Sequence, residues 1–120
     1  MTDPRETLAR IRERADAATD GPWMGVCDSD GYLGRVIGPD GFGIAEDFRD
    51  DADAEFIAAA RTDVPRLVDA LEKVLELHKD DGFDWGHGRS FCAECQQGDG
   101  LPVPYPCPIV TAITQALTTA

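Results

Sequence analysis

The last third of the chain places closely spaced cysteines in a stretch that has little tendency to fold by itself. Residues 79–106 are dense in glycine, aspartate and proline and show no helical periodicity, which predicts a loop. Loops of this length are uncommon in compact domains unless something ties them down. Cys92 and Cys95 form a C-x-x-C inside the loop, and Cys107 follows directly after it. A long loop that contains closely spaced cysteines is expected to be held by a cross-link between them. This combination therefore limits the possible folds more than any other feature of the sequence.

Four side chains in and around this loop have the chemistry and spacing of a structural zinc site. Cysteines two residues apart, such as Cys92 and Cys95, can place both sulfurs on one tetrahedral ion through a tight turn. Cys107 precedes a proline and should cap the last helix, whose positive end favours a metal-binding thiolate. His78 ends the apolar face of the preceding helix and is the expected fourth ligand, while the glycine-flanked His87 is the competing candidate. The sequence thus predicts a structural Zn2+ ion held by His78, Cys92, Cys95 and Cys107.

Other interpretations of the cysteines remain open from the sequence. A redox C-x-x-C is disfavoured because the pair does not lead from a strand into a helix. A metal-dependent hydrolase would need an open coordination position and a nearby base, for which Glu94 between the cysteines is the candidate. We expect Glu94 to be a solvated turn residue, which favours a role without catalysis and leaves the hydrolase as the alternative. Cys27 stands apart in a strand-like stretch and is expected to be a small buried apolar residue.

The first half of the chain predicts a helix followed by a small sheet. Asp3-Pro4-Arg5-Glu6 combines a helix cap, a proline at the first helical position and a capping-box glutamate, and breakers at residues 19–22 end this helix. Three runs rich in aromatic and branched residues follow, separated by turn sequences, and predict a three-stranded antiparallel meander. These runs are Trp23–Asp28, Tyr32–Ile37 and Phe42–Ala45.

A helix pair and a final helix complete the predicted α+β fold. The first helix of the pair covers Ala54–Arg61 and is preceded by carboxylates, which suit the positive end of a helix. Thr62-Asp63-Val64-Pro65 is expected to interrupt the chain and to cap a longer helix up to His78, in which apolar residues recur at helical spacing. The final helix is expected over Pro108–Leu117, after the zinc-tied loop.

The length of the chain, 120 residues, suits one domain with a single core. We expect one domain over residues 1–120, with a helix–sheet–helix core over 1–78 and a zinc-binding loop plus helix over 79–120. No apolar run reaches the roughly 18 residues of a membrane span, and residues 1–14 lack the apolar segment of a secretory signal. A cytoplasmic protein without a membrane partner is therefore expected.

The charge of the chain disfavours direct nucleic-acid binding. Asp and Glu outnumber Lys and Arg by 23 to 11, a formal net charge of -12, and the basic residues form no cluster. Such a surface repels phosphate backbones. The charge is sufficiently explained by solubility, and a protein partner is expected. An alternative is an acidic inhibitor that imitates DNA and occupies a nucleic-acid-binding protein.

Two stretches resemble small uncharacterised proteins of actinobacteriophages and their hosts. One is residues 53–67, preceded here by Gly21-Pro22-Trp23 and short strands. The other pairs Cys92-Ala93-Glu94-Cys95 with Tyr105-Pro106-Cys107-Pro108, and is similar to the end of such proteins, where a histidine after a helix precedes C-x-x-C and Y/W-P-C-P. The resemblance implies that His78 is that histidine. It also implies a phage-type accessory protein and brings no established activity.

Overall fold

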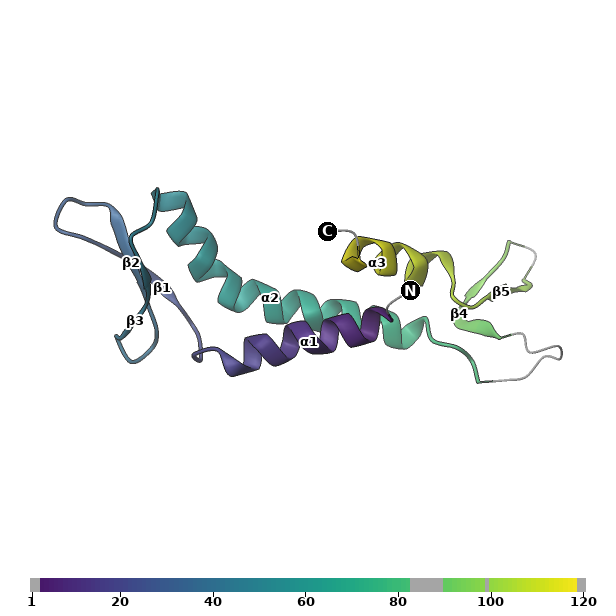
Figure 1. Cartoon of the computed structure of the whole chain (residues 1–120). Helices are drawn as coiled ribbons and strands as arrows, with labels where there is room; N and C mark the ends of the chain where they lie inside the picture. Colours follow the sequence, from purple (N-terminus) through teal and green to yellow (C-terminus); the bar gives the residue numbers. More distant parts are fainter. Residues whose placement is uncertain (1–2, 83–89, 99, 119–120) are drawn as a thin grey trace. The chain divides into compact units, whose positions relative to one another are not determined.

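The computed structural model describes residues 3–82, 90–98 and 100–118 and has an α+β fold (Figure 1). The elements in chain order are α1 (Pro4–Ala17), β1 (Met24–Cys27), β2 (Leu33–Ile37), β3 (Gly43–Glu46), α2 (Asp51–Leu77), β4 (Phe91–Gln96), β5 (Pro102–Pro104) and α3 (Pro108–Thr118). The predicted α+β class, with its N-terminal helix, three-stranded antiparallel sheet and C-terminal helix, is confirmed. Within the described ranges, no helix is both long and apolar enough to cross a membrane.

The chain forms two compact units whose boundaries fall inside α1 and α2. Unit 1 contains residues 1–10 and 69–120, and unit 2 contains residues 11–68. Unit 1 therefore holds every residue of the predicted zinc site, and unit 2 holds the three-stranded sheet. This division into units does not decide how many domains the chain forms, so one domain over residues 1–120 stays a prediction.

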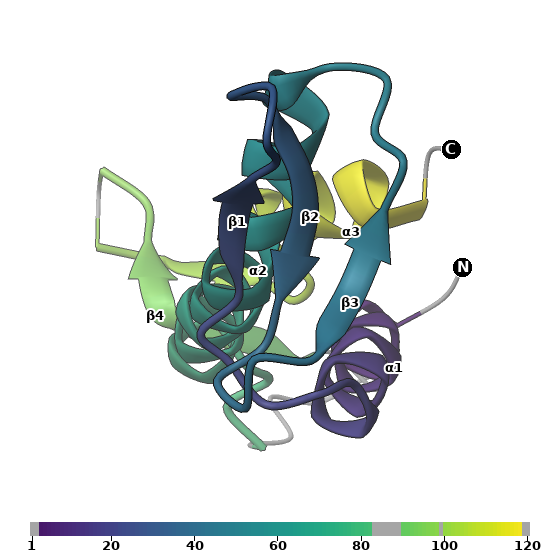
Figure 2. The same ribbon diagram turned by 90° about the vertical axis from the view of Figure 1, so that its left-hand side faces the viewer.

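The sheet of unit 2 has the strand order β1-β2-β3, with β2 between two antiparallel neighbours (Figure 2). Asp28 shapes the first turn, because its carboxylate accepts hydrogen bonds from the backbone N–H groups of Asp30 and Tyr32 at 2.9 and 3.0 Å. Gly31 in this turn and Gly41 in the next have φ values of 85° and 84°, which favour glycine. Local turn chemistry therefore supports the strand pairing.

The start of α2 is fixed by two aspartates. Asp50 caps the helix, since its side chain accepts a hydrogen bond from the N–H of Asp53 at 3.2 Å. Asp51 lies in the first turn, where the helix dipole favours a carboxylate. Its side chain accepts a hydrogen bond from the backbone N–H of Leu33 in β2 at 3.0 Å, so the helix start is joined to the sheet.

One continuous helix replaces the predicted break at residues 62–65. Pro65 lies inside α2, and because proline has no N–H, the carbonyl of Arg61 cannot receive its usual helical hydrogen bond. An interior proline costs a helix about 3 kcal/mol. Apolar spacing nevertheless continues on both sides of it, and Val68 and Leu75 are almost completely buried. We attribute the continuity to this burial, which outweighs the local propensity to break.

Two apolar side chains of the unit 2 sheet differ in burial because one lies in the central strand and the other in an edge strand. Val36 lies in the central strand β2 and is fully buried, as is Ala54 of α2. Cys27 ends the edge strand β1 and is exposed, so the prediction of a buried Cys27 is wrong. The hydrophobic character of a cysteine does not reveal whether its strand lies at the edge of the sheet.

The core of unit 1 combines apolar side chains with two of the cysteines. Asp3 caps α1 as predicted, accepting a hydrogen bond from the N–H of Arg5 at 2.9 Å. Among the described residues of unit 1, the buried side chains are Pro4 and Leu8 of α1, Leu75 of α2, Cys92 of β4, Cys107, and Val110 and Thr114 of α3. Sulfur atoms and aliphatic side chains thus share one interior.

The stretch predicted as a loop contains a second, two-stranded antiparallel sheet, β4-β5. Backbone hydrogen bonds also join the segment after α2 to β4: Asp81 N–H donates to the carbonyl of Phe91 at 2.9 Å, and Ala93 N–H donates to the carbonyl of Lys79 at 2.8 Å. The expectation of an irregular loop is therefore wrong for these residues. β5 begins and ends with proline, a residue that is rare in strands. This composition explains why the sequence did not predict a strand here.

Candidate metal centre

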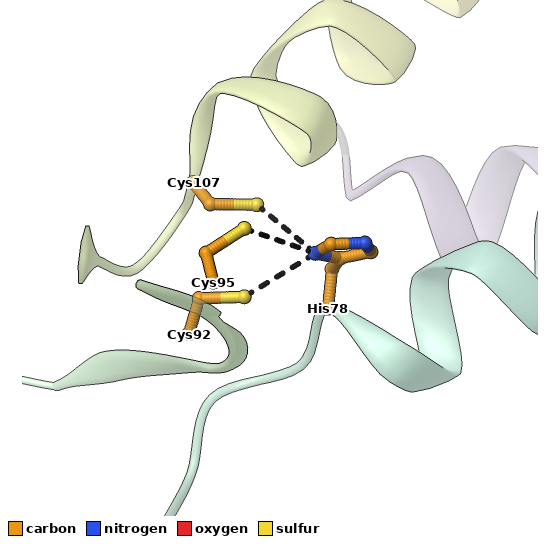
Figure 3. Close-up of side chains that lie close together, drawn as sticks. All are labelled: His78, Cys92, Cys95 and Cys107. Atoms are coloured by element: carbon orange, nitrogen blue, oxygen red, sulfur yellow. Dashed lines mark hydrogen bonds between the residues drawn. The ribbon is translucent and has the colours of Figure 1, made fainter. Parts of the chain in front are cut away.

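Four side chains of unit 1 point toward one another from three parts of the chain (Figure 3). They are His78 after α2, Cys92 and Cys95 in β4, and Cys107 before α3. Their ligand atoms all lie within 4.8 Å of one another. The Nδ1 atom of His78 lies 3.5 Å from Cys92 Sγ, 3.3 Å from Cys95 Sγ and 3.7 Å from Cys107 Sγ. These four residues are positioned to bind a metal ion.

Hydrogen bonding alone does not explain this arrangement. The Nδ1 atom of an imidazole either donates one proton or accepts one through a single lone pair. Three sulfurs at 3.3 to 3.7 Å from the same nitrogen exceed that capacity. A cation between the four atoms would satisfy all of them at once. The geometry therefore favours a shared ion over a network of thiol hydrogen bonds.

His78 takes its place from the end of α2. Its backbone N–H donates to the carbonyl of Val74 at 3.1 Å, so the helical hydrogen bonding continues to this residue. Leu75, one turn earlier, is only 1% exposed and anchors this end of the helix in the core of unit 1. The apolar periodicity that predicted an inward-facing His78 thus has a structural cause.

A bulge in β4 lets both of its cysteines reach the cluster. In a regular strand, side chains three positions apart point to opposite faces. From Phe91 to Gln96, however, the paired residue on β5 moves only from Pro104 to Pro102, so β4 carries extra residues. Cys92 and Cys95 therefore point to the same place, which the C-x-x-C spacing alone would not give in a straight strand.

Cys107 caps α3, as predicted from the proline that follows it. Its carbonyl accepts a hydrogen bond from the N–H of Thr111 at 3.0 Å, and Pro108 occupies the first helical position. The sulfur is fully buried and accepts hydrogen bonds from the amides of Val110 and Ile109. The positive end of the helix thus faces the sulfur, which stabilises a thiolate there.

The cysteines differ in how readily they ionise. Burial, followed by hydrogen bonds with Cys92 and Cys107, raises the pKa of Cys95 to about 12. At Cys107, burial acts to raise the pKa, but the amides of Val110 and Ile109 and the neighbouring thiols together lower it. Three thiolates packed this closely would repel one another, and a cation removes that penalty because it stabilises all of them.

Arg5 and Tyr105 support the cluster and were not identified from the sequence. The guanidinium of Arg5 donates to the carbonyl of Leu75 at 2.6 Å and to the hydroxyl of Tyr105 at 3.0 Å. It thereby joins α1 to the end of α2 that carries His78 and to the segment that carries Cys107. A signal was present, since a basic residue in the first turn of a helix opposes the helix dipole and needs another reason to be there.

Solvent reaches the cluster from the side of β4. A shallow hollow of about 350 Å³ borders Cys92 and Cys95 and is lined by Lys79, Gln96 and Pro102, among others. Cys95 is partly exposed, whereas Cys92 and Cys107 are buried. Glu94, the candidate base of a catalytic zinc, is exposed.

All four ligands named from the sequence are brought together by the structure. His87, the competing fourth ligand, lies outside the described residues. A comparison of the chain with protein-family models, curated proteins and solved structures finds no match.

Proposed function

We propose that His78, Cys92, Cys95 and Cys107 hold one structural zinc ion, and that the protein is a small zinc-stabilised interaction module. The convergence of three sulfurs on one imidazole nitrogen, at 3.3 to 3.7 Å, carries the proposal. A tetrahedral ion with Zn–S bonds of about 2.3 Å and a Zn–N bond of about 2.0 to 2.1 Å separates sulfur and nitrogen ligands by about 3.6 Å. The observed distances fit that tetrahedron.

The donor set supports zinc over other common ions. Calcium and magnesium prefer oxygen ligands, and no carboxylate belongs to the cluster among the residues described. Three thiolates and one imidazole in a compact tetrahedral arrangement are typical of structural zinc sites. Zinc also has no redox chemistry of its own, which suits a site that holds a fold together.

A structural role is supported over hydrolysis. Four protein ligands fill a tetrahedral coordination sphere, whereas a catalytic zinc keeps a position for water. The ligands come from three separate segments, so binding one ion would close the chain between His78 and Cys107, which lie 29 positions apart. A site of this kind stabilises the fold and leaves the function to other surfaces.

The proposed biological role is that of an accessory protein that binds another protein. The net charge of -12 disfavours phosphate backbones as partners. The resemblance of the Cys92–Cys95 and Tyr105–Pro108 segments to actinobacteriophage proteins supports an accessory role of the phage type. A cytoplasmic site of action belongs to the same proposal, because a reducing compartment keeps clustered cysteines available for metal.

Metal analysis of matched histidine variants tests the site. The purified wild-type protein should contain one equivalent of zinc per chain, and His78→Ala should lose it. His87→Ala is the matched control, since it removes the competing histidine, and it should retain the full equivalent. If His78→Ala retains zinc while His87→Ala loses it, the proposed ligand set is wrong. If neither the wild type nor any variant binds zinc, the structural-metal proposal itself is refuted.

A further inference from the structure

Unit 2 carries an apolar groove that neither the metal cluster nor the sheet explains. It has a volume of about 230 Å³ and lies between the second half of α1 and the first half of α2. Its apolar walls are formed by Ile11 and Ala15 of α1, by Ala18 directly after α1, and by Ala60, Val64 and Pro65 of α2. The side chains of Trp23, Arg14 and Arg61 line the rest of the groove. We call this set of residues the Trp23 groove.

The tryptophan of the groove is held in place by its neighbours. Its indole Nε1–H donates to the carbonyl of Thr19 at 3.0 Å. The guanidinium of Arg61 lies 5.9 Å from the centroid of a Trp23 ring, and the same group donates to the carbonyl of Ala15. These side chains are therefore ordered before any ligand arrives, which reduces the entropic cost of binding.

The groove has positive charge at its edge on a strongly acidic protein. Arg14 is exposed, and it has no ion-pair partner in the part of the chain that the structure describes. The partners of Arg61 are a carbonyl and an aromatic ring, neither of which is an anion. Two uncompensated guanidinium groups thus flank one apolar surface, in a chain whose acidic residues outnumber its basic ones by 23 to 11.

Size and charge together indicate the class of ligand. The volume of about 230 Å³ lies below the roughly 300 to 1,000 Å³ of pockets for small organic ligands. It suits one or two aliphatic side chains of a peptide. Nucleic acid is a poor match, because two arginines cannot offset the charge of -12. Tryptophan and arginine are the residue types most enriched where protein interfaces concentrate their binding energy.

We infer that the Trp23 groove binds a short segment of a partner protein in which an apolar side chain lies next to an aspartate or glutamate. The apolar side chain fills the groove against Trp23, and the carboxylate pairs with Arg14 and Arg61. This inference deepens the interaction role proposed above. It does not depend on the metal, because every residue of the groove belongs to unit 2.

Selection from a random peptide library displayed on phage, with the zinc-loaded protein of 120 residues as bait, tests the inference. Enriched peptides should share an apolar residue within a few positions of Asp or Glu. A synthetic peptide of the selected sequence should bind wild-type protein, and Trp23→Ala should weaken it at least tenfold. Arg14→Glu should weaken it about tenfold or more, because it replaces attraction by repulsion. Arg35→Glu on the exposed face of β2 makes the same charge change outside the groove and should leave the affinity unchanged.

Several outcomes would overturn the inference. One is a selection that gives no common sequence, and another is a selected peptide that binds Trp23→Ala and Arg14→Glu as well as it binds wild type. Sedimentation could instead reveal a dimer that Arg14→Glu dissociates, in which case the groove binds a second copy of the chain. Arg14 is exposed, so this variant should fold even where Trp23→Ala does not. One zinc equivalent without peptide binding refutes the groove alone. Groove-dependent peptide binding by a purified protein that takes up no zinc when zinc is supplied refutes the metal proposal alone.

Discussion

The two compact units share short-range stabilising features and differ in how they bring distant residues together. In unit 2, turn aspartates, glycines with positive φ and a helix cap each stabilise a segment of a few residues. Strand pairing then joins these segments into one sheet. Unit 1 has helix caps and glycines with positive φ as well, and in addition its four clustered His and Cys side chains bring together residues as far apart as His78 and Cys107. Short-range rules therefore account for the small sheet, whereas in the glycine- and proline-rich tail the proposed ion would supply a long-range cross-link.

Loss of a sulfur ligand should have the largest effect and should separate the two units. Structural zinc contributes about 10 to 16 kcal/mol of apparent binding free energy, which is available only when the ligands are assembled. Cys107→Ser should therefore abolish zinc binding and disorder the C-terminal part of unit 1, as measured by metal content and NMR line positions. Resonances of residues 24–46 should change little.

Cys27→Ser is the matched control for that experiment. Cys27 is exposed and lies outside the cluster, so this variant should retain one zinc equivalent and the wild-type spectrum of unit 1. Equal loss of zinc in both cysteine variants would show that the cluster is not the binding site.

A pair of core truncations should sharpen the comparison. Leu75→Ala leaves a cavity next to the helix end that carries His78 and should cost about 2 to 5 kcal/mol of unfolding free energy. Its zinc should also be lost to a competing chelator more rapidly. Val36→Ala in β2 should cost about 2 kcal/mol, while its zinc affinity should stay at the wild-type value. Denaturant unfolding and chelator competition measure the two effects. Zinc affinities that fall equally in both variants would contradict the separation of the units.

Arg5→Ala should destabilise the segments that carry His78 and Cys107, because it removes the hydrogen bonds that Arg5 donates to them. The side chain donates to Leu75 and Tyr105, and hydrogen bonds from a charged group contribute about 1.5 to 3 kcal/mol. Tyr105→Phe removes one of these bonds and should cost about 1 kcal/mol. Zinc dissociation followed with a chromogenic chelator should be faster in both variants. Arg10→Ala on the exposed surface of α1 is the control, and an equal change there would remove the special role of Arg5.

The smallest effect is expected at the cap of α2. Asp50→Ala should destabilise the protein by about 1 kcal/mol, because the N–H of Asp53 loses its side-chain acceptor. Zinc content should not change, since Asp50 lies in unit 2. Asp63→Ala, at an exposed position inside the same helix, removes an equal charge without removing a cap and should have a smaller effect on thermal unfolding. Equal destabilisation by the two variants would attribute the effect to charge alone.

Local chemistry made much of the fold predictable. The cap at Asp3, the three strands and the final helix after Cys107 all follow from short sequence signals, and the structure has them within a few residues of the expected bounds. The four clustered side chains were predictable for a related reason. Cysteine and histidine have few roles that require this spacing in a stretch without helical periodicity.

The features that sequence reasoning missed depend on contacts between distant residues. α2 passes through Pro65 because apolar burial continues beyond it, and no local rule measures that burial. β5 pairs with β4 although prolines form its ends, since pairing depends on the partner strand as well as on propensity. The position of Arg5 in the first turn of α1 could have marked it as unusual, but its partners Leu75 and Tyr105 lie 70 and 100 positions away, so no local pattern identifies them.

Hydrogen exchange with and without a metal chelator tests the central claim most directly. With zinc bound, backbone amides should be protected both in the β1-β2-β3 sheet and in β4 and α3. After the ion is removed, protection should be lost in β4 and α3 and retained in the sheet of unit 2. Unchanged protection of β4 and α3 in protein shown by metal analysis to be zinc-free would contradict the account.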